Sequence, residues 1–421
     1  MSLKFHMSHT IQKCRICGSQ TLTEVLSLGE QSLTGVFPRS TEEKISRGSL
    51  ELVKCEGENS CGLIQLGQSF DAAEMYGDNY GYRSGLNQSM VKHLDTKVAR
   101  LQEYIGGLKT GELVLDIGCN DGTLLGFYPE TVDRIGIDPT VGKFLRFYNS
   151  DIEIIEGFFS AEIYKKHHGS RKAKIVTSIA MFYDLESPMG FVEQIASILA
   201  DDGVWHFEQS YLPAMLNANA YDTICHEHLE YYGLYQIKWM LKRCGLEIVD
   251  FELSDVNGGS FAVTAAKCGA PYKINSVMIK GVLEAEKNMC LHSTQPYEQF
   301  CARILQHRDE LMNKLNALQQ QGAKIFGYGA STKGNVILQF CGITAEQIPY
   351  IADVNPDKFG CFTPGTNIPI ISEEEAHSMS PDYFLVLPWH FRNNIIQRET
   401  VFLANGGKLL FPLPQIEIVT K

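Results

Sequence analysis

Residues 113–122 read LVLDIGCNDG and residues 135–139 read IGIDP, and these two stretches decide the fold of the chain. Val114–Ile117 is a mainly apolar run, too short for a helix, that ends at Gly118, where a turn brings backbone close to a ligand. The second stretch is a short strand that ends at Asp138, about twenty residues later. We therefore predict two parallel strands whose carboxyl ends face one crevice.

The glycine spacing at this turn differs from that of a dinucleotide site. Gly118 and Gly122 are separated by three residues, whereas a dinucleotide fingerprint reads G-x-G-x-x-G. The pattern D-x-G-x-x-x-G, followed by an acid after the second strand, resembles class I methyltransferases. That resemblance implies an S-adenosylmethionine site in which Asp138 accepts hydrogen bonds from the ribose hydroxyls, with Asp116, Gly118, Cys119 and Asn120 around the turn. The alternative is a general α/β turn in which Asp138 caps a helix and the other residues are structural.

Further strands follow in the order expected for a doubly wound α/β sheet. The strand ending at 154–159 brings Gly157 and Phe158 to the position where such enzymes hold adenine, and residues 175–179 form the next strand. Met181 and Tyr183 follow that strand and therefore lie over the same crevice, Tyr183 as a candidate active-site phenol. A helix is predicted over 191–199, a turn at 201–203 and a strand over 204–209.

Composition indicates an enzyme of two or three domains with a small substrate. The chain has 421 residues, 44% of them hydrophobic, and a net charge of −12 without a basic run, which argues against nucleic acid. It has no apolar run of the roughly twenty residues needed to cross a bilayer and no signal-peptide core at its start, so we expect a cytoplasmic protein without a membrane partner. Without a coiled-coil seam or repeat, we expect a monomer or a weak homo-oligomer.

Four cysteines near the start form a candidate metal site. Cys14 and Cys17 lie in the tight turn KCRICG, and Cys55 and Cys61 lie in LVKCEGENSCGL. Four thiolates complete a tetrahedral zinc site and leave no open position, so the predicted zinc is structural. The alternative is four buried free cysteines.

A segment rich in tyrosine and glycine lies between the cysteines and the first strand of the sheet. Tyr80 and Tyr82 are candidates for a loop that covers the cofactor, whereas Tyr76 is better explained as part of a linker. Helical periodicity begins at about Asn87.

The chemistry of the chain concentrates at Cys225-His226-Glu227-His228. In an extended loop His226 and His228 point to one side and Glu227 to the other. Histidine near its ordinary pKa is a suitable base for removing a proton beside a carbonyl, and Glu227 can orient it. Two alternatives are a metal pair of the H-x-H kind, for which no third ligand is evident, and ordinary core histidines.

The last third of the chain carries a second glycine turn. After a helix over about 297–320, residues 324–335 read KIFGYGASTKGN, a strand, a turn and the start of a helix, whose N–H groups suit a phosphate. A strand ending at Asp353 follows, and 384–388 forms another. The candidate substrate ligands in this part are Ser331, Thr332, Lys333, Asn335, Asp353, Asn355, Trp389 and His390. The alternatives are a domain that only packs against its neighbour, and a second cofactor such as NAD.

Nearly the whole chain resembles one family, the three-domain S-adenosylmethionine-dependent C-methyltransferases of nucleotide-linked 4-keto deoxysugars. The shared features are the four cysteines, Tyr80-Gly81-Tyr82, the His-Glu-His motif and the second Rossmann-like domain. The resemblance implies a zinc domain at 1–75, a methyltransferase domain at 76–270 and a linker with a nucleotide-sugar domain at 271–421.

The family pattern makes His228 the base, and it differs from this chain at two places. Where the family has a tyrosine, this chain has Cys225. The phenol would then come from Tyr221, Tyr183 or Tyr82, or the reaction would need none. Where the family has His-Gly-Gly-Ser, this chain has Asn257-Gly258-Gly259-Ser260. Asn257, Gly259 and Ser260 can still bind substrate, but the Asn257 amide cannot take up a proton as a histidine does.

The resemblance implies methyl transfer to C3 of a nucleotide-linked 4-keto-6-deoxysugar. His228 removes the C3 hydrogen, an enolate forms, and C3 attacks the methyl group, while His226 or a tyrosine stabilises the enolate oxygen. The alternatives are an N- or O-methyltransferase, which needs no carbon acid, and a scaffold of binding modules without catalysis.

Overall fold

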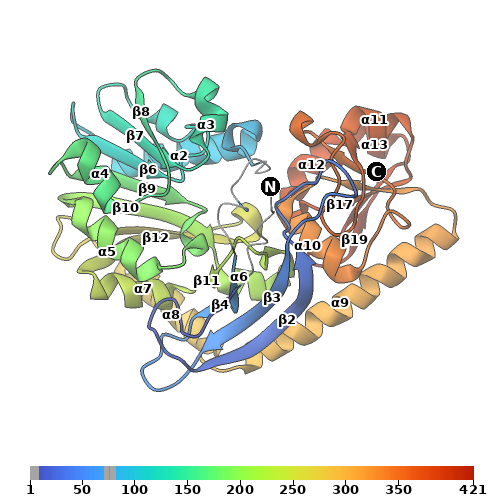
Figure 1. Ribbon diagram of the computed structural model, residues 1–421, viewed down its shortest axis with the longest axis horizontal. Coiled ribbons are helices and arrows are strands. Elements are labelled where there is room, and N and C mark those ends of the chain that lie inside the picture. Colours follow the sequence, from blue (N-terminus) through green and yellow to red (C-terminus); the bar gives the residue numbers. More distant parts are fainter. Residues whose placement is uncertain (1–8, 71–74, 76–81) are drawn as a thin grey trace.

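The structure of the protein is a computed structural model that describes residues 9–70, 75 and 82–421. Figure 1 shows two α/β bodies side by side, with strands β2 and β3 of the N-terminal part below and between them and helix α9 along the lower edge. Within the described residues, no helix is long and apolar enough to cross a membrane.

The N-terminal part is a small antiparallel sheet that takes one strand from the middle of the chain. Its order is β11-β4-β3-β2, and a two-stranded ribbon of β1 and β5 lies beside it. β11 (Glu230–Tyr231) follows directly after the His-Glu-His motif, so this sheet reaches the residues predicted to carry the chemistry. The other strands are β1 (His9–Thr10), β2 (Leu22–Ser32), β3 (Arg47–Cys55), β4 (Ile64–Leu66) and β5 (Gln68–Ser69).

The first α/β body has seven strands in the order β12-β13-β10-β9-β6-β7-β8. β13 is antiparallel to both neighbours, and the remaining pairs are parallel. The chain order reverses between β6 and β9, which is where an open α/β sheet binds its ligand. The predicted doubly wound fold is therefore confirmed. The strands are β6 (Leu113–Ile117), β7 (Asp133–Asp138), β8 (Ile152–Glu156), β9 (Ala173–Ile179), β10 (Leu199–Ser210), β12 (Leu246–Ser254) and β13 (Ser260–Lys267).

The helices of this body begin close to the predicted positions. α2 (Gln88–Tyr104) starts after Asn87, whose side chain caps it by accepting a hydrogen bond from the Ser89 amide. The turn predicted at 201–203 is wrong: β10 begins at Leu199, and its pairing with β9 is irregular between Leu199 and Val204. The other helices are α3 (Val141–Phe144), α4 (Ala161–His168), α5 (Pro188–Ile198), α6 (Leu212–Asn217) and α7 (Leu234–Arg243).

Aromatic side chains fill the core behind the crevice. The rings of Trp205 and Phe207 on β10 stack at 4.2 Å, and Phe182 meets Trp205 edge-on at 5.3 Å. Phe182 also stacks on Tyr232 at 5.5 Å. Because Phe182 precedes Tyr183 and Tyr232 follows β11, this packing holds two loops of the candidate site on the rigid sheet.

The second α/β body follows the helices α8 (Ser276–Asn288) and α9 (Gln295–Gln320), of which α9 matches the predicted linker helix. Its order is β16-β15-β14-β17-β18-β19, again with a reversal, here between β14 and β17. The predicted second Rossmann-like domain is confirmed by this topology. Its elements are β14 (Ile325–Tyr328), α10 (Thr332–Cys341), β15 (Ile351–Asp353), β16 (Ile370–Ser372), α11 (Glu373–Ser378), β17 (Tyr383–Val386), α12 (Arg392–Arg398), α13 (Thr400–Ala404), β18 (Lys408–Phe411) and β19 (Glu417–Val419).

The end of β2 is bonded to α10 of the second body. The Ser32 amide donates to Gln339 Oε1 at 2.8 Å, and Gln339 Nε2 donates to the Ser32 carbonyl at 3.1 Å. Asn335 Nδ2 donates to the Thr34 carbonyl at 2.7 Å. The N-terminal sheet therefore contacts both α/β bodies through backbone groups, which fixes its position between them.

Candidate active site and metal centre

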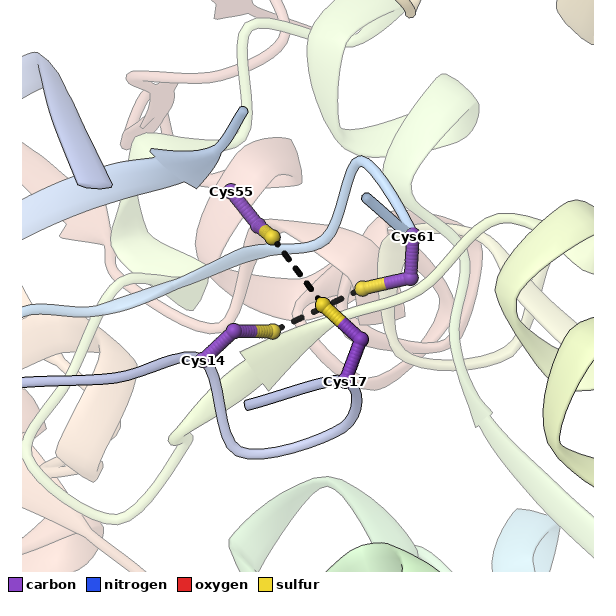
Figure 2. Close-up of side chains that lie close together, drawn as sticks. All are labelled: Cys14, Cys17, Cys55 and Cys61. Carbon is purple, nitrogen blue, oxygen red and sulfur yellow. Dashed lines mark hydrogen bonds between the residues drawn. The ribbon is translucent and has the colours of Figure 1, made fainter. Parts of the chain in front are cut away.

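The four predicted metal ligands converge. Figure 2 shows the sulfur atoms of Cys14, Cys17, Cys55 and Cys61 facing one another, and all lie within 4.8 Å. Cys14 Sγ is 3.5 Å from Cys61 Sγ, and Cys17 Sγ is 3.3 Å from Cys55 Sγ. This is the only such cluster in the described part of the chain.

The geometry of these sulfurs fits zinc. Ligands at the usual Zn–S distance of about 2.3 Å in a tetrahedron are about 3.8 Å apart. Hydrogen bonds from Cys55 and Cys61 lower the pKa of the Cys14 thiol, whereas the same hydrogen bonds with Cys14 raise the pKa of Cys55 and of Cys61. Cys14 is therefore the thiol most ready to form a thiolate, the form that binds metal. Four protein sulfurs close the site, so the metal would hold the fold together without a position for substrate.

The cofactor crevice lies at the carboxyl ends of β6 and β7. Gly118 has φ +74° and Asn120 has φ +50°, so the turn after β6 uses the left-handed region that glycine tolerates best. Asp138 accepts a hydrogen bond from the Asn120 amide at 3.0 Å and one from the Thr140 amide at 2.6 Å. Asp138 thus joins the turn after β6 to the end of β7, and its role at the ribose remains a prediction.

Asp116 is buried beneath this turn. Thr177 Oγ1 donates to its carboxylate at 2.6 Å, and burial raises the pKa of Asp116 to about 7. Cys119 has its side chain in the apolar core, with Sγ 3.2 Å from Tyr148 Oη. Asp116 and Cys119 therefore shape the turn from below, and only the backbone of Cys119 remains for a ligand.

Residues 82–85 lie directly on the glycine turn. The Ser84 amide donates to Asn120 Oδ1 at 3.0 Å, and the Gly85 amide donates to Asp121 Oδ2 at 2.9 Å. Asn120 Nδ2 donates in turn to the Tyr82 carbonyl at 3.2 Å. The Tyr82 side chain is 49% exposed, and Tyr80 lies outside the described residues.

The far wall of the crevice carries an aromatic ring and a thioether. Phe158 is 56% exposed and follows Gly157, whose φ is +140°. A Cβ at Gly118 would lie 3.1 Å from Met181 Cγ, so the thioether is directly beside the turn. The thioether beside the glycine turn and the strand-end carboxylate of Asp138 fit the predicted S-adenosylmethionine site, and Phe158 follows the next strand of the sheet, β8.

The His-Glu-His motif is a tight turn and not an extended loop, in which His226 and His228 would point to one side. The His228 amide donates to the Cys225 carbonyl at 3.2 Å, so alternation of side chains does not apply. His226 and His228 accordingly contact different parts of the molecule. The predicted alternative of an H-x-H metal pair is not found among the described residues.

His228 has the arrangement of a base. Its Nδ1 is 2.7 Å from the Thr223 carbonyl, which can only accept, so Nδ1 carries the hydrogen and Nε2 keeps its lone pair. Burial, followed by the charge of Lys333, lowers the pKa of His228 to about 3, so it is neutral at pH 7. Its ring meets that of Tyr183 edge-on at 4.3 Å, which places the predicted phenol beside the predicted base.

His226 faces the N-terminal sheet. Its Nδ1 is 3.5 Å from Thr34 Oγ1, and its Nε2 is 3.4 Å from the Gly48 carbonyl. Phe70 packs edge-on against the ring at 4.8 Å. The structure thus places both ring nitrogens of His226 on the N-terminal part, away from the neighbours of His228.

Glu227 lies where the three parts of the molecule meet. A Cβ atom placed on Gly35 would lie only 2.0 Å from Glu227 Oε1, so the carboxylate packs directly against Gly35 of the N-terminal part. The same position is 3.5 Å from Thr332 Oγ1, which brings the start of α10 close to Glu227. Burial raises the pKa of Glu227 to about 7. The carboxyl group can therefore hold or release a proton near neutral pH.

Lys333 reaches from α10 to the methyltransferase-type body. Its Nζ donates to the Asn257 carbonyl at 2.8 Å, and burial lowers its pKa although Asp222 opposes the shift. Trp389 Nε1 donates to Asp222 Oδ2 at 2.8 Å. Burial, followed by Lys333, lowers the pKa of His390. These groups form the wall of the site on the side of the second α/β body.

Several predicted substrate ligands are engaged in local structure. Ser331 Oγ caps α10 by accepting from the Gly334 amide, and buried Asn335 bonds to Thr34. Asp353 accepts hydrogen bonds from the Ala330 amide at 2.7 Å and from the Asn355 amide at 2.7 Å. Gly259 and Ser260 follow Asn257 in the β12–β13 turn, where Ser260 Oγ donates to the Val256 carbonyl at 2.9 Å.

Cys225, at the family's tyrosine position, and Tyr221, one of the proposed substitutes, are fixed in the core. Cys225 is fully buried, and burial raises the pKa of its thiol. Tyr221 is also fully buried, with its hydroxyl 3.2 Å from His307 Nδ1 of α9. Of the three tyrosines proposed as substitutes, Tyr183 is the one whose ring contacts His228.

Sequence reasoning missed Thr223 and Asp222. Thr223 contacts His228 through its backbone carbonyl, which every residue has, so the side chain at this position could not have predicted the contact. Asp222 is buried and bonded to Trp389 of the second body, 167 positions away. The only signal was a single acid, six residues before the last histidine of the motif.

The sequence matches three family models in chain order. They are a zinc-binding domain over 14–76, a methyltransferase domain over 90–250 and a C-methyltransferase C-terminal domain over 255–414. Among curated proteins, the C-methyltransferase NovU of Streptomyces niveus is 29% identical over 416 residues, which cover 97% of each chain.

Solved structures match part of the chain at low similarity. An S-adenosylmethionine-dependent methyltransferase from Clostridium acetobutylicum has 12% identity and a TM-score of 0.34 over 42% of this chain and 92% of its own. The plantazolicin methyltransferase BpumL, solved with a substrate analogue and SAH, has 14% identity and a TM-score of 0.34 over 44% of this chain and 88% of its own. Neither likeness is close enough to bear on substrate or mechanism.

The fold and the crevice define a class I methyltransferase with a cysteine-rich N-terminal domain. The full-length similarity to NovU and the three family models place the chain among the S-adenosylmethionine-dependent C-methyltransferases. When bound, S-adenosylmethionine supplies an electrophilic methyl group. The turn after β6, Asp138, Met181 and Phe158 are the residues that would hold it.

Replacing Asp138 by Asn should weaken binding of S-adenosylhomocysteine about tenfold or more, because an amide cannot accept the ribose and backbone hydrogen bonds as a carboxylate does. Isothermal titration calorimetry measures the affinity. Asp201→Asn is the control, since Asp201 is exposed near the start of β10, where it pairs with Lys267. Unchanged affinity in Asp138→Asn would contradict the assignment of the ribose position.

Replacing Cys61 by Ser should remove bound zinc and lower the melting temperature, because the metal site contributes folding free energy. Zinc is measured by atomic emission and stability by calorimetry. Cys268→Ser is the control, since Cys268 is exposed. A Cys61→Ser protein with full zinc content would show that the four cysteines are not the ligands.

Proposed function

We propose that this C-methyltransferase acts on C3 of a nucleotide-linked 4-keto-6-deoxysugar, with His228 as the base. The observation that carries the proposal is the Nε2 lone pair of His228 in a buried site between the two α/β bodies. A carbon acid next to a ketone needs such a neutral base, whereas methylation of an amine or a hydroxyl does not require one at this position.

The residues around His228 suit proton removal followed by attack of carbon. The Thr223 carbonyl fixes the tautomer and the ring direction, so Nε2 can take the C3 hydrogen. The negative charge then develops on the C4 oxygen of the sugar. Lys333 is a buried ammonium close enough to lower the pKa of His228, and Tyr183 lies against the ring. Both are donors that can stabilise the enolate oxygen.

The second α/β body supports the assignment of a nucleotide handle. The turn after β14 leads into α10, whose first residues include Thr332 and Lys333. The start of a helix attracts phosphate through its free N–H groups and its dipole. With Glu227 against the same helix start, a diphosphate held there would place the attached sugar toward His228.

The test is a methylation assay in deuterium oxide with nucleotide-linked 4-keto-6-deoxysugars and S-adenosylmethionine. His228→Asn should lower the rate of methyl transfer about 10²–10⁴-fold and abolish exchange of the C3 hydrogen, because it removes the base. Mass spectrometry measures both the methyl group and the deuterium.

His292→Asn is the matched control, since His292 is exposed on the segment between α8 and α9. Wild-type activity in His228→Asn would show that His228 is not the base. A wild-type protein that neither exchanges nor methylates any sugar of the panel would reject the substrate class.

A further inference from the structure

Arg15 lies inside the metal turn, between Cys14 and Cys17, yet its side chain is only 3% exposed. Its guanidinium donates to the Leu66 carbonyl at 2.7 Å, to the Gln68 carbonyl at 3.0 Å and to Ser69 Oγ at 2.9 Å. Its own amide donates to Gln65 Oε1 at 3.1 Å. The side chain therefore binds the whole segment from β4 to β5.

Two carboxylates lie against the same guanidinium. Arg15 Nε is 3.4 Å from Glu186 Oε2 and 3.8 Å from Glu230 Oε1. Ser69 Oγ also donates to Glu186 Oε2 at 2.9 Å. Burial raises the pKa of Glu230, and the positive charge of Arg15 acts in the opposite direction. An arginine is thus the counterion of a buried carboxylate on β11.

Short backbone connections run from these partners to the candidate active site. The Leu66 amide donates to the Leu229 carbonyl at 2.8 Å, one residue after His228. The Leu229 amide donates to the Tyr183 carbonyl at 2.8 Å. Glu186 follows Tyr183 by three residues, so Arg15 holds both the strand that follows the base and the loop that carries the phenol.

We propose that Arg15 is a positioning residue, which sets His228 and Tyr183 relative to each other by bonding to Leu66 on one side and Glu186 on the other. This role rests on the proposed function of His228. It also makes the metal turn part of the active-site framework, because Arg15 can reach these partners only while Cys14 and Cys17 hold its backbone in the turn.

The requirement is for arginine and not for positive charge alone. Its planar fork offers five N–H donors, and here it serves two carbonyls, a hydroxyl and a carboxylate in different directions. A lysine ammonium keeps the positive charge, but its donors all lie on one nitrogen, so it cannot bond to partners in several directions as the guanidinium does. Arg15→Lys therefore separates the geometry of the contact from its electrostatics.

The experiment compares Arg15→Lys with Lys13→Gln, which changes an exposed cation two residues away. We expect Arg15→Lys to keep one zinc per chain and wild-type affinity for S-adenosylhomocysteine. Its kcat for methyl transfer should fall tenfold or more with a smaller change in KM, because small displacements of reacting groups cost about a hundredfold in rate. Lys13→Gln should match wild type throughout.

A second readout does not need the sugar substrate. In ¹⁵N-histidine NMR, the His228 signal, identified by its loss in His228→Asn, should titrate at higher pH in Arg15→Lys than in wild type. The reason is that a displaced ring is less buried, and burial is what lowers its pKa. This signal tests the positioning role even if the sugar panel is wrong.

Two results would overturn the proposal. An unchanged His228 signal in Arg15→Lys would show that the ring does not depend on the arginine. Loss of zinc and of S-adenosylhomocysteine binding together would show that Arg15 supports folding in general and has no specific effect on the site.

Discussion

The pairing of β4 with β11 is the contact on which the arrangement of this protein depends. β4 follows the last metal ligand by a few residues, whereas β11 follows His228, and the two strands exchange backbone hydrogen bonds in the register Glu230 to Gln65. Unpaired backbone groups are costly when buried, so each strand fixes the other. The turn at 225–228 is therefore built on the N-terminal sheet although it belongs to the sequence of the methyltransferase domain.

This construction accounts for the dry surroundings of the titratable groups. Residues 225–228 are covered from below by the N-terminal sheet and from the side by α10, so burial dominates the pKa of His228, of Glu227 and of Lys333. In each case burial acts against the charged form. Burial keeps the His228 imidazole neutral, so Nε2 is free to accept a proton, but the lowered pKa also makes it a weaker base. The same burial strengthens any donor that meets the developing enolate.

The sequence predicted the parts of the site that depend on short spacing. Gly118 and Asp138 belong to one strand-turn-strand unit, and the four cysteines belong to two turns, so local patterns were sufficient. The conformation at Cys225–His228 could not be predicted, because the strand next to this turn pairs Glu230 with Gln65, 165 positions earlier, and such a pairing leaves no local signature. The partners of Asp222 and Arg15 were invisible for the same reason: each lies in a distant segment.

If the metal turn and β4 hold the turn at 225–228 in place, loss of zinc should loosen both segments together. Hydrogen–deuterium exchange with mass spectrometry, on the protein with zinc and after its removal by a chelator, tests it most directly. Removal of zinc should speed exchange in peptides covering residues 64–66 and 225–231, while the strands β6 and β7 stay protected. Unchanged exchange over 225–231 in the zinc-free protein would contradict the claim.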